Sequence, residues 1–324
     1  MQTQCNTESI EFHPNNKRQV IGQFDGGRIT SDGGSMLLRE VETRMQIIRQ
    51  FAGCFKDYRS PLLTEHSVEE LVAQRVYGLA LGYEDLNDHD ELRTDPTLAV
   101  LVGKDDPEGK NRFRQRDRGK ALAGKSTLNR LELGKPGTVP EKDSYKKIII
   151  DADAVERFLV DVFLQEHDDP PKEIVLDMDA TDDPLHGQQE GRFFHGYYRN
   201  YCYLPLYIFC GEHLLCAKLR PSNIEAAFGA MKEIEHIVNR IRRQWPSVRI
   251  IIRGDSGFCR EEIMTWCEGN KVGYILGLAQ NNRLREAIEC ELELVKAQYE
   301  TTGESARVYK EFQYKTLTRI SHTR

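Results

Sequence analysis

Apolar residues in the first half of the chain recur at helical spacing. Over residues 35–55 and 66–81 they fall on one face of a helix, and Ser67 is placed to cap the second segment. Residues 151–166 repeat the pattern, whereas residues up to Lys17 lack it and are expected to form a loose arm. Further short helices are expected at 86–92, 96–102 and 126–133. The pattern therefore predicts a mostly helical region over residues 1–170.

Beyond Pro170 and Pro171 the pattern changes to short runs rich in β-branched and aromatic residues. Strands are expected at 173–179, 192–198, 201–209, 214–219, 248–253 and 272–278, and helices at 223–244 and 260–268. The succession is strand, hairpin strands, helix, strand, helix, strand. This is the order of a ribonuclease-H-like fold, an α/β architecture in which the first strand lies beside the strand that follows the long helix.

The end of the chain differs again. An acidic helix is expected at 284–299, and residues 304–318 begin to alternate like a strand. No further strand follows before Arg324, and a buried strand needs hydrogen-bonded neighbours. We therefore suspect that the reading frame is truncated.

Two of the expected strands end at a carboxylate. Asp179 closes the run 173–179, and Asp255 follows the run 248–253. Because ligands of open α/β sheets bind beyond the carboxyl ends of the strands, we expect these acids to meet there. Asp177 points the same way as Asp179, and such hard oxygens suit Mg²⁺ or Mn²⁺. The pattern predicts metal-assisted attack on a phosphodiester.

Other polar residues close to Asp179 have simpler interpretations. Asp182 and Asp183 are explained as turn and capping residues, which are ordinary after a strand. His186 is equally consistent with orienting a phosphate and with capping a turn. Capping explains poorly why two acids share one face at the end of an apolar strand.

Composition narrows the class of protein. The chain has 324 residues, 39% of them hydrophobic, enough for one large domain or two ordinary ones. No stretch of about 18 apolar residues and no secretory signal occur, so we expect a cytoplasmic protein without a membrane span. The eight cysteines form no Cys-x-x-Cys pair. Reduced thiols are therefore expected, rather than a zinc knuckle or a disulfide framework.

A basic stretch stands out against the net charge of −6. Residues 104–147 contain thirteen Lys and Arg against seven Asp and Glu. Arginines spaced around an aromatic residue suit a phosphate backbone, and a solvated loop is the simpler alternative. The candidate DNA-binding residues are Arg112, Arg114, Arg116, Arg118, Lys120, Lys125 and Arg130.

Residues 119–126 match the phosphate-loop pattern Gly-x-x-x-x-Gly-Lys-Ser. That motif requires a buried strand directly before it, and residues 112–118 are too highly charged to form one. We therefore interpret the match as chance, and the segment as a DNA-contacting loop and helix.

In several segments the chain resembles the DDE transposases of bacterial insertion sequences, in the branch called DDE domain group one, the thirteen-eighty family. The resemblance covers about residues 24–282. The segments, in order, are Phe24-Asp25-Gly26-Gly27 with Thr30-Ser31-Asp32-Gly33, Gln74-Arg75-Val76-Tyr77-Gly78 running on to Asn87-Asp88-His89, Arg93-Thr94-Asp95-Pro96, Ser126-Thr127-Leu128-Asn129-Arg130-Leu131-Glu132, residues 177–191, and Arg253-Gly254-Asp255-Ser256-Gly257-Phe258.

This resemblance implies a retroviral-integrase-type ribonuclease-H-like core, in which three acids bind two Mg²⁺ or Mn²⁺ ions. Such enzymes hydrolyse DNA at the terminal inverted repeats of the element and join the freed 3′ hydroxyl to target DNA. Asp179, which precedes Thr181 in an Asp-x-Thr step, would be the first acid, with Asp177 as its rival. Asp255 would be the second. The third, a glutamate on a helix beyond a β-rich insertion, in a Tyr-…-Glu-Asn-x-Ile-Lys type of motif, is missing from this chain. By this resemblance, residues 171–283 would be the first part of the core and residues 284–324 the start of that insertion, truncated.

The resemblance also implies DNA as the partner, a homodimer as the active form and a bacterial, nucleoid-associated location in the cytoplasm. Because the third acid is missing, a catalytically inactive DNA-binding remnant is an alternative function. It would bind element ends through residues 1–170. A stand-alone nuclease on the same fold is a further alternative.

Overall fold

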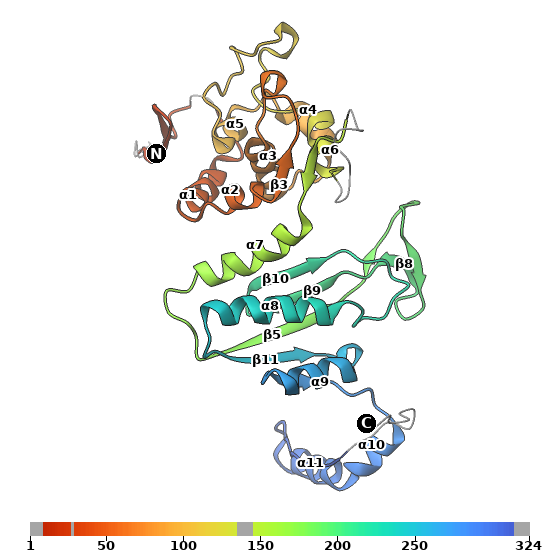
Figure 1. The fold of residues 1–324 in the computed structure, drawn as a ribbon. Helices are drawn as coiled ribbons and strands as arrows, with labels where there is room; N and C mark the ends of the chain where they lie inside the picture. The colour runs from red at the N-terminus through yellow and green to blue at the C-terminus, as the bar shows by residue number, and fades with distance from the viewer. Residues whose placement is uncertain (1–8, 27–28, 135–144, 314–324) are drawn as a thin grey trace. The chain divides into compact units, whose positions relative to one another are not determined.

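The computed structural model describes residues 9–26, 29–134 and 145–313, and the chain divides into two compact units (Figure 1). The first unit contains Met1–Pro171, His213–Cys216 and His236–Ser247, and the second contains Lys172–Glu212, Ala217–Glu235 and Val248–Arg324. No helix within the described ranges is both long enough and apolar enough to cross a lipid bilayer.

The first unit is mostly helical, as the periodicity predicts. Its described helices are α1 (Met36–Met45), α2 (Ile47–Ala52), α3 (Val68–Ala80), α4 (His89–Leu92), α5 (Pro96–Val102), α6 (Lys125–Glu132) and α7 (Ala152–Gln165). Two antiparallel strand pairs accompany them, β1 (Ile10–Asn15) with β2 (Arg18–Gly22) and β3 (Phe55–Asp57) with β4 (Ile148–Ile150). The expectation of a loose arm up to Lys17 is therefore wrong for Ile10–Asn15, because these residues form β1 and pair with β2.

Local capping decides where two of these helices begin. The Ser67 hydroxyl accepts a hydrogen bond from the Glu70 amide (3.1 Å), and the Glu70 carboxylate accepts one from the Ser67 amide (2.9 Å). This capping box confirms the predicted start of α3. The single helix predicted over 35–55 is wrong, because Gln46 takes a left-handed φ of 53° and the Glu42 carboxylate caps a new helix through the Ile48 amide (2.8 Å).

The hydrophobic core of the first unit gathers one face from each of several helices. α3 packs against α2, α5 and α6. The fully buried residues of this core include Leu71, Ala99, Leu128 and Ile148. Since these residues come from segments up to about eighty positions apart, burial of apolar surface joins α3, α5, α6 and β4 into one body.

A five-stranded mixed sheet has the strand order β10-β9-β5-β11-β12, and all its strands except most of β10 belong to the second unit. The strands are β5 (Glu173–Ala180), β9 (Leu206–Cys210), β10 (His213–Lys218), β11 (Arg249–Gly254) and β12 (Gly273–Leu276). β5 pairs antiparallel with β9 and parallel with β11, and β11 pairs parallel with β12. The predicted adjacency of the first strand and the strand after the long helix is confirmed.

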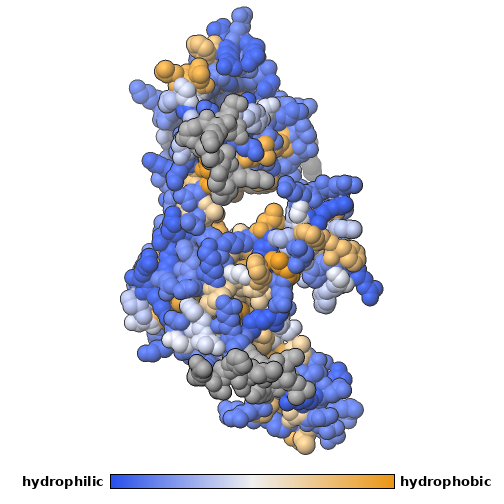
Figure 2. All heavy atoms as spheres, turned by 45° about the vertical axis from the view of Figure 1, so that its right-hand side comes forward, coloured by the Kyte–Doolittle hydropathy of each residue, from blue (hydrophilic) through white to orange (hydrophobic). Residues whose placement is uncertain are grey.

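Helices and a small second sheet accompany these strands along the chain (Figure 1). The long helix α8 (Ala230–Gln244) lies between β10 and β11 in the sequence, and its buried residues include Ile234, Ile237, Val238 and Ile241. The helix α9 (Glu261–Gly269) connects β11 to β12. A three-stranded sheet of order β6-β8-β7 joins β6 (Asp183–Pro184), β7 (Phe193–His195) and β8 (Asn200–Tyr203). The face drawn in Figure 2 is mostly hydrophilic, with scattered hydrophobic patches.

Several predicted boundaries in this unit are wrong. The strand expected at 201–209 is two strands, β8 and β9, because Pro205 lies between them and lacks the amide hydrogen that a ladder needs. The helix expected from residue 223 begins only at Ala230.

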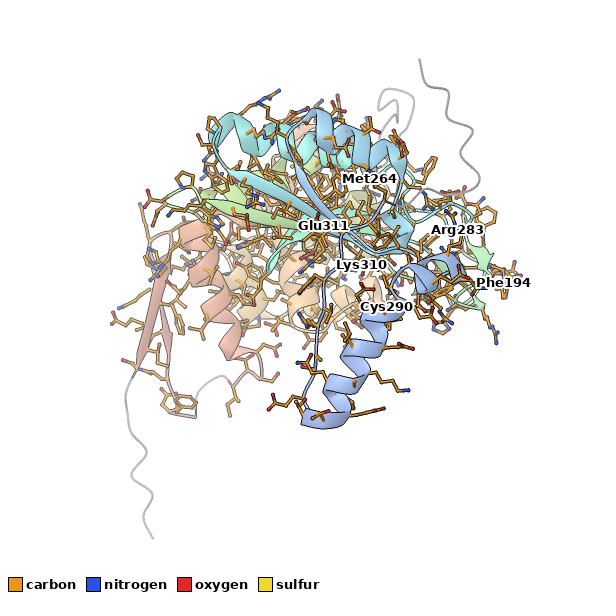
Figure 3. The ribbon with its side chains drawn as sticks, turned by 90° about the horizontal axis from the view of Figure 1, so that it is seen from below. Phe194, Met264, Arg283, Cys290, Lys310 and Glu311 are labelled. Carbon is orange, nitrogen blue, oxygen red and sulfur yellow. The ribbon has the colours of Figure 1, made fainter. Side chains whose placement is uncertain are left out.

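The strand expected at 304–318 is not observed. Residues 304–313 form no strand, and 314–318 lie outside the described residues. Instead, Lys310 pairs with Glu291 (3.0 Å) on α11 (Glu289–Thr302), which follows α10 (Asn282–Ala287) (Figure 3).

One buried histidine gives the first unit a predicted acid sensitivity. Burial, followed by the nearby charges of Lys104, Arg112 and Arg59, lowers the pKa of His66 to about 3. The unfolded chain takes up this proton near pH 6.5 and the folded chain only near pH 3, so stability falls as the pH drops through that window. The free energy of unfolding should lose about 1.4 kcal/mol per pH unit from this group, as urea titrations between pH 7 and 4 would measure.

A matched pair of variants isolates that contribution. His66→Gln should lower the free energy of unfolding at neutral pH. It should also reduce the slope of that free energy against pH by the contribution of one proton, because the variant has no imidazole to protonate. His186→Gln changes an exposed histidine and serves as the control. An unchanged slope in His66→Gln would show that acid sensitivity arises elsewhere.

Candidate active site

The parallel pairing of β5 with β11 places the two predicted acids at the same edge of the sheet. Gly254 lies opposite Met178, and Asp255 and Asp179 are the residues that follow them. Asp255 keeps an extended conformation (φ −75°, ψ −171°), so side-chain alternation continues past the end of β11. The two carboxylates therefore leave neighbouring strands at corresponding positions.

Asp177, the rival first acid, is already neutralised. The Arg253 guanidinium faces it across the strand pair and forms a bidentate ion pair, in which the Arg253 Nη2 to Asp177 Oδ2 distance is 2.8 Å. The hydrogen bonds from Arg253, and the opposite charge, raise the pKa of the guanidinium further. A carboxylate held in this fork has both oxygens occupied, so Asp177 is less available to a metal than Asp179.

Asp179 and Asp255 remain open to solvent. Asp179 is exposed, and within the described ranges its side chain makes no hydrogen bond or ion pair. Asp255 uses Oδ1 to accept a hydrogen bond from the Gly257 amide (2.8 Å), which shapes the turn after β11. A Cβ at Gly277 would lie 2.9 Å from the Ser256 amide nitrogen, so the absence of a side chain there lets the end of β12 pack against this turn. The turn is fixed while the second Asp255 oxygen stays available.

A tyrosine that the sequence analysis missed lies next to these acids. The Tyr198 hydroxyl donates a hydrogen bond to the carbonyl of Ala180, the residue after Asp179 (3.2 Å). Burial raises the pKa of Tyr198, and the charges of Asp182, Asp179 and Asp255 raise it further. The phenol therefore stays protonated, and its one O–H holds the hairpin to the backbone beside Asp179. A single tyrosine in a hairpin carries no sequence signal for this position.

The donor set fits a hard divalent cation in part. Asp179 and Asp255 supply exposed carboxylate oxygens on rigid backbone, which Mg²⁺ and Mn²⁺ prefer. Across the described parts of the chain, no three His, Cys, Asp or Glu residues group closely enough to hold a metal. Two acids can share one ion, whereas a pair of ions needs at least one more ligand from elsewhere.

The candidate DNA-binding residues fall into two groups. Arg114, Arg116 and Arg118 are exposed, with Arg116 3.8 Å from Asp117. The others also make internal contacts: Arg112 pairs with Glu65 (2.8 Å), Lys120 donates to the Arg116 carbonyl (3.2 Å), Lys125 lies 3.5 Å from Asp90, and the Arg130 guanidinium lies 4.4 Å from the Tyr145 ring centre. The first group is the part most available to a phosphate backbone.

The middle of the segment with the phosphate-loop pattern, residues 121–123, is buried. Gln74 clamps Ala123 through both backbone groups, accepting from its amide (3.0 Å) and donating to its carbonyl (2.8 Å). The Leu122 amide bonds to the Arg93 carbonyl (3.2 Å), and both residues 122 and 123 are buried. These amides are occupied, and the described residues 58–118 directly before Gly119 contain no strand. The segment therefore lacks the strand and the free amides of a phosphate loop, in agreement with the sequence interpretation.

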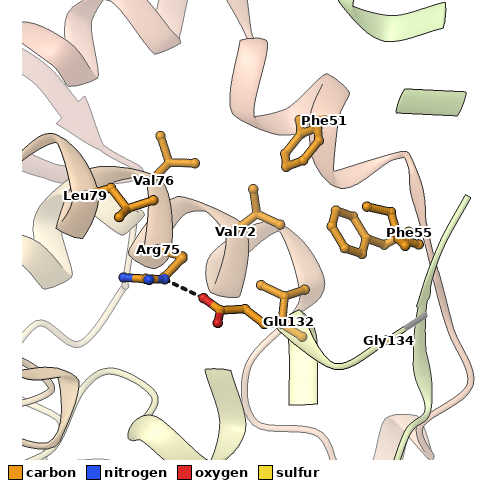
Figure 4. A pocket seen from close by; sticks show the side chains of 10 residues that line it. Phe51, Phe55, Val72, Arg75, Val76, Leu79, Glu132 and Gly134 are labelled. Atoms are coloured by element: carbon orange, nitrogen blue, oxygen red, sulfur yellow. Dashed lines mark hydrogen bonds and ion pairs between the residues drawn. The ribbon is translucent and has the colours of Figure 1, made fainter. Parts of the chain in front are cut away.

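A separate cavity of about 250 Å³ lies in the first unit (Figure 4). Its lining is apolar, with Phe51, Phe55 and Val72 among its residues, and an Arg75–Glu132 ion pair of 2.6 Å lies in its wall. The cavity contains none of the predicted acids and no nucleophile. It is therefore a packing feature of the helical unit.

Comparisons with known proteins identify the family. No curated protein matches the chain. A cryo-EM structure of the piggyBac transposase synaptic complex with hairpin DNA is similar at 10% identity and a TM-score of 0.36, covering 78% of this chain and 53% of that one. This chain thus spans about half the length of that transposase chain. The family model for transposase DDE domain group 1 matches residues 12–324, nearly the whole sequence. The chain belongs to the transposase DDE domain group 1 family.

Proposed function

We propose that this chain is a transposase of a bacterial insertion sequence, in which Asp179 and Asp255 are the first two acids of the DNA-cleaving site. One observation carries the proposal: the parallel register of β5 and β11 brings two exposed carboxylates to one sheet edge in a member of a DDE transposase family. Hydrolysis at the terminal inverted repeats, and joining of the 3′ hydroxyl to target DNA, are the reactions assigned to this site.

The proposed division of labour follows the sequence. Residues 171–283 form the first part of a ribonuclease-H-like core, residues 1–170 bind the element ends, and residues 284–324 start an insertion. The strand order and the helix α8 between the two acid-bearing segments support the core assignment. Active homodimers associated with the nucleoid are part of the same proposal.

DDE transposases use divalent metal ions. Asp179 and the free oxygen of Asp255 would hold the ion in this chain, while Asp177 stays in its ion pair with Arg253 and does not bind the ion. When bound, the ion supplies Lewis-acid activation of water and stabilises the leaving oxygen. The chain itself contributes rigid placement, because both acids follow hydrogen-bonded strands and the Asp255 turn is pinned by Gly257 and Gly277. A third carboxylate would be needed for a second ion.

A second function is favoured by the ligand count. The described residues bring no third metal ligand to Asp179 and Asp255. A chain with this donor set would bind element ends without cutting them and would compete with an active copy. Cleavage and binding assays on the same protein distinguish the two functions.

The acid-bearing site generates a direct prediction. Asp179→Asn and Asp255→Asn should each lower Mg²⁺-dependent nicking of inverted-repeat DNA at least about 100-fold, because each removes a charged metal ligand. Asp183→Asn, an exposed aspartate on β6, should leave the rate within about twofold and serves as the control. Full activity in both acid variants would refute the assignment, and binding without nicking by the unmodified chain would establish the second function.

The basic segment generates another prediction. Replacing Arg114, Arg116 and Arg118 by Gln should weaken binding to duplex DNA of any sequence, because phosphate contacts carry no sequence information. The slope of log K against log salt should fall by about 0.9 for each residue that meets a phosphate, as fluorescence anisotropy between 50 and 200 mM salt would measure.

The control for charge is a triple variant of the same unit, Lys17→Gln, Arg18→Gln and Arg44→Gln, which removes three exposed positive charges elsewhere. If both triple variants lowered the slope equally, the basic segment would contribute only general charge, and the solvated-loop interpretation would hold.

A further inference from the structure

The β7–β8 hairpin presents aromatic side chains to solvent rather than to the core. Tyr197 is 84% exposed, Phe194 57% and Tyr201 49%. Phe194 lies opposite Tyr201 in the hairpin, with their ring centres 5.6 Å apart, and the Arg192 guanidinium lies 4.7 Å from the centre of the Tyr201 ring. Figure 3 shows Phe194 at the outer edge of this hairpin. Clustered exposed aromatic surface of this kind marks an interaction site.

The hairpin is held firmly to the rest of the second unit. The Ser222 hydroxyl donates to the Phe193 carbonyl (2.9 Å), and the Tyr203 hydroxyl donates to the Glu190 carbonyl (2.5 Å). Asn200 donates to the Asp182 carboxylate (3.0 Å). Because these bonds anchor both strands, the exposed rings are a preorganised surface, and ordering them on binding costs little.

Two consecutive tyrosines connect this surface to the acids. Tyr198 turns inward, where its hydroxyl bonds to the Ala180 carbonyl next to Asp179. Tyr197 turns outward, and its ring meets the Tyr198 ring edge-on at 5.0 Å and 88°. The most exposed aromatic ring of the hairpin is therefore one ring away from the carboxylate edge of the sheet.

We propose that Tyr197 stacks on an unpaired nucleobase of the DNA strand held at Asp179 and Asp255, with Phe194 offering a second stacking surface. A duplex hides the faces of its bases, so an exposed ring next to a phosphodiester site can stack only where a base is unpaired or turned out. Arg192 complements this role, since a guanidinium on an aromatic face can also meet a phosphate. The location of the base rests on the proposed function; the stacking itself needs no metal and no catalysis.

The test uses a single-stranded oligonucleotide of mixed sequence carrying 2-aminopurine, with EDTA present throughout. The unmodified protein should quench the fluorophore on binding, because stacking on a ring quenches its emission. Tyr197→Ala and Tyr197→Leu should weaken binding about 5- to 140-fold and reduce the quench, the range expected for losing one stacked base. Tyr197→Phe and Tyr197→Trp should retain both, since they keep an aromatic face.

Matched controls separate stacking from general effects. Tyr309→Ala removes a ring of similar exposure (86%) far from the hairpin in sequence and should change nothing. Equal binding by Tyr197→Leu and Tyr197→Phe would overturn the proposal, because burial of apolar surface would then suffice. Loss of self-association in Tyr197→Ala, measured by light scattering without DNA, would also overturn it by assigning the hairpin to a contact between copies.

The outcome is independent of the catalytic assignment. Asp179→Asn should keep the full quench in EDTA, and the Tyr197 variants should be compared for nicking of inverted-repeat DNA in Mg²⁺. If the unmodified protein quenches the fluorophore but Asp179→Asn remains fully active in nicking, the stacking surface is supported and the catalytic assignment of the acids is refuted. If Tyr197→Ala quenches as strongly as the unmodified protein while Asp179→Asn no longer nicks DNA, the stacking proposal is refuted and the catalytic assignment is supported.

Discussion

The parallel pairing of β5 with β11 is the constraint on which the rest of the second unit depends. Side chains alternate along a strand, so a slip of one residue would turn Asp179 to the opposite face from Asp255. The register is secured from both sides. Ile174, Leu176, Ile250 and Ile252 are buried on one face, and Arg253 pairs with Asp177 on the other. Apolar burial and one ion pair thus select the same register.

The Asp177–Arg253 pair also separates two acids that look equivalent in the sequence. Two carboxylates on one strand face repel each other unless positive charge balances them. Arg253 neutralises Asp177 and leaves Asp179 exposed at the end of the strand. The structure thereby gives the two aspartates different environments, one suited to holding the sheet together and one suited to meeting a ligand.

The family motifs of the first unit are largely structural. Gln74 clamps Ala123 with two backbone hydrogen bonds, and Arg75 pairs with Glu132 while donating to the carbonyls of Tyr83 (3.2 Å) and Glu84 (2.7 Å). These side chains tie loops to α3 where apolar contact alone would leave polar backbone unpaired. Their specificity in sequence therefore reflects how the helical unit is built, and the exposed arginines at 114, 116 and 118 are left as its candidate DNA contacts.

The sequence by itself determined the order of elements, the ends of α3, α5 and α7, and the two acid-bearing strands, because periodicity, caps and β-branched runs are local signals. It missed β3 and β4, because these short strands pair with each other across a long stretch of the chain. It also missed the local hairpin of β1 with β2 and the break at Gln46, where Glu42 caps a new helix. Only the tertiary structure decided three contacts. Arg253 forms an ion pair with Asp177, Gln74 forms hydrogen bonds with the backbone of the segment that has the phosphate-loop pattern, and Tyr198 lies beside the acids. Each is a contact between segments distant in sequence, and such contacts form only when the burial of apolar surface brings those segments together.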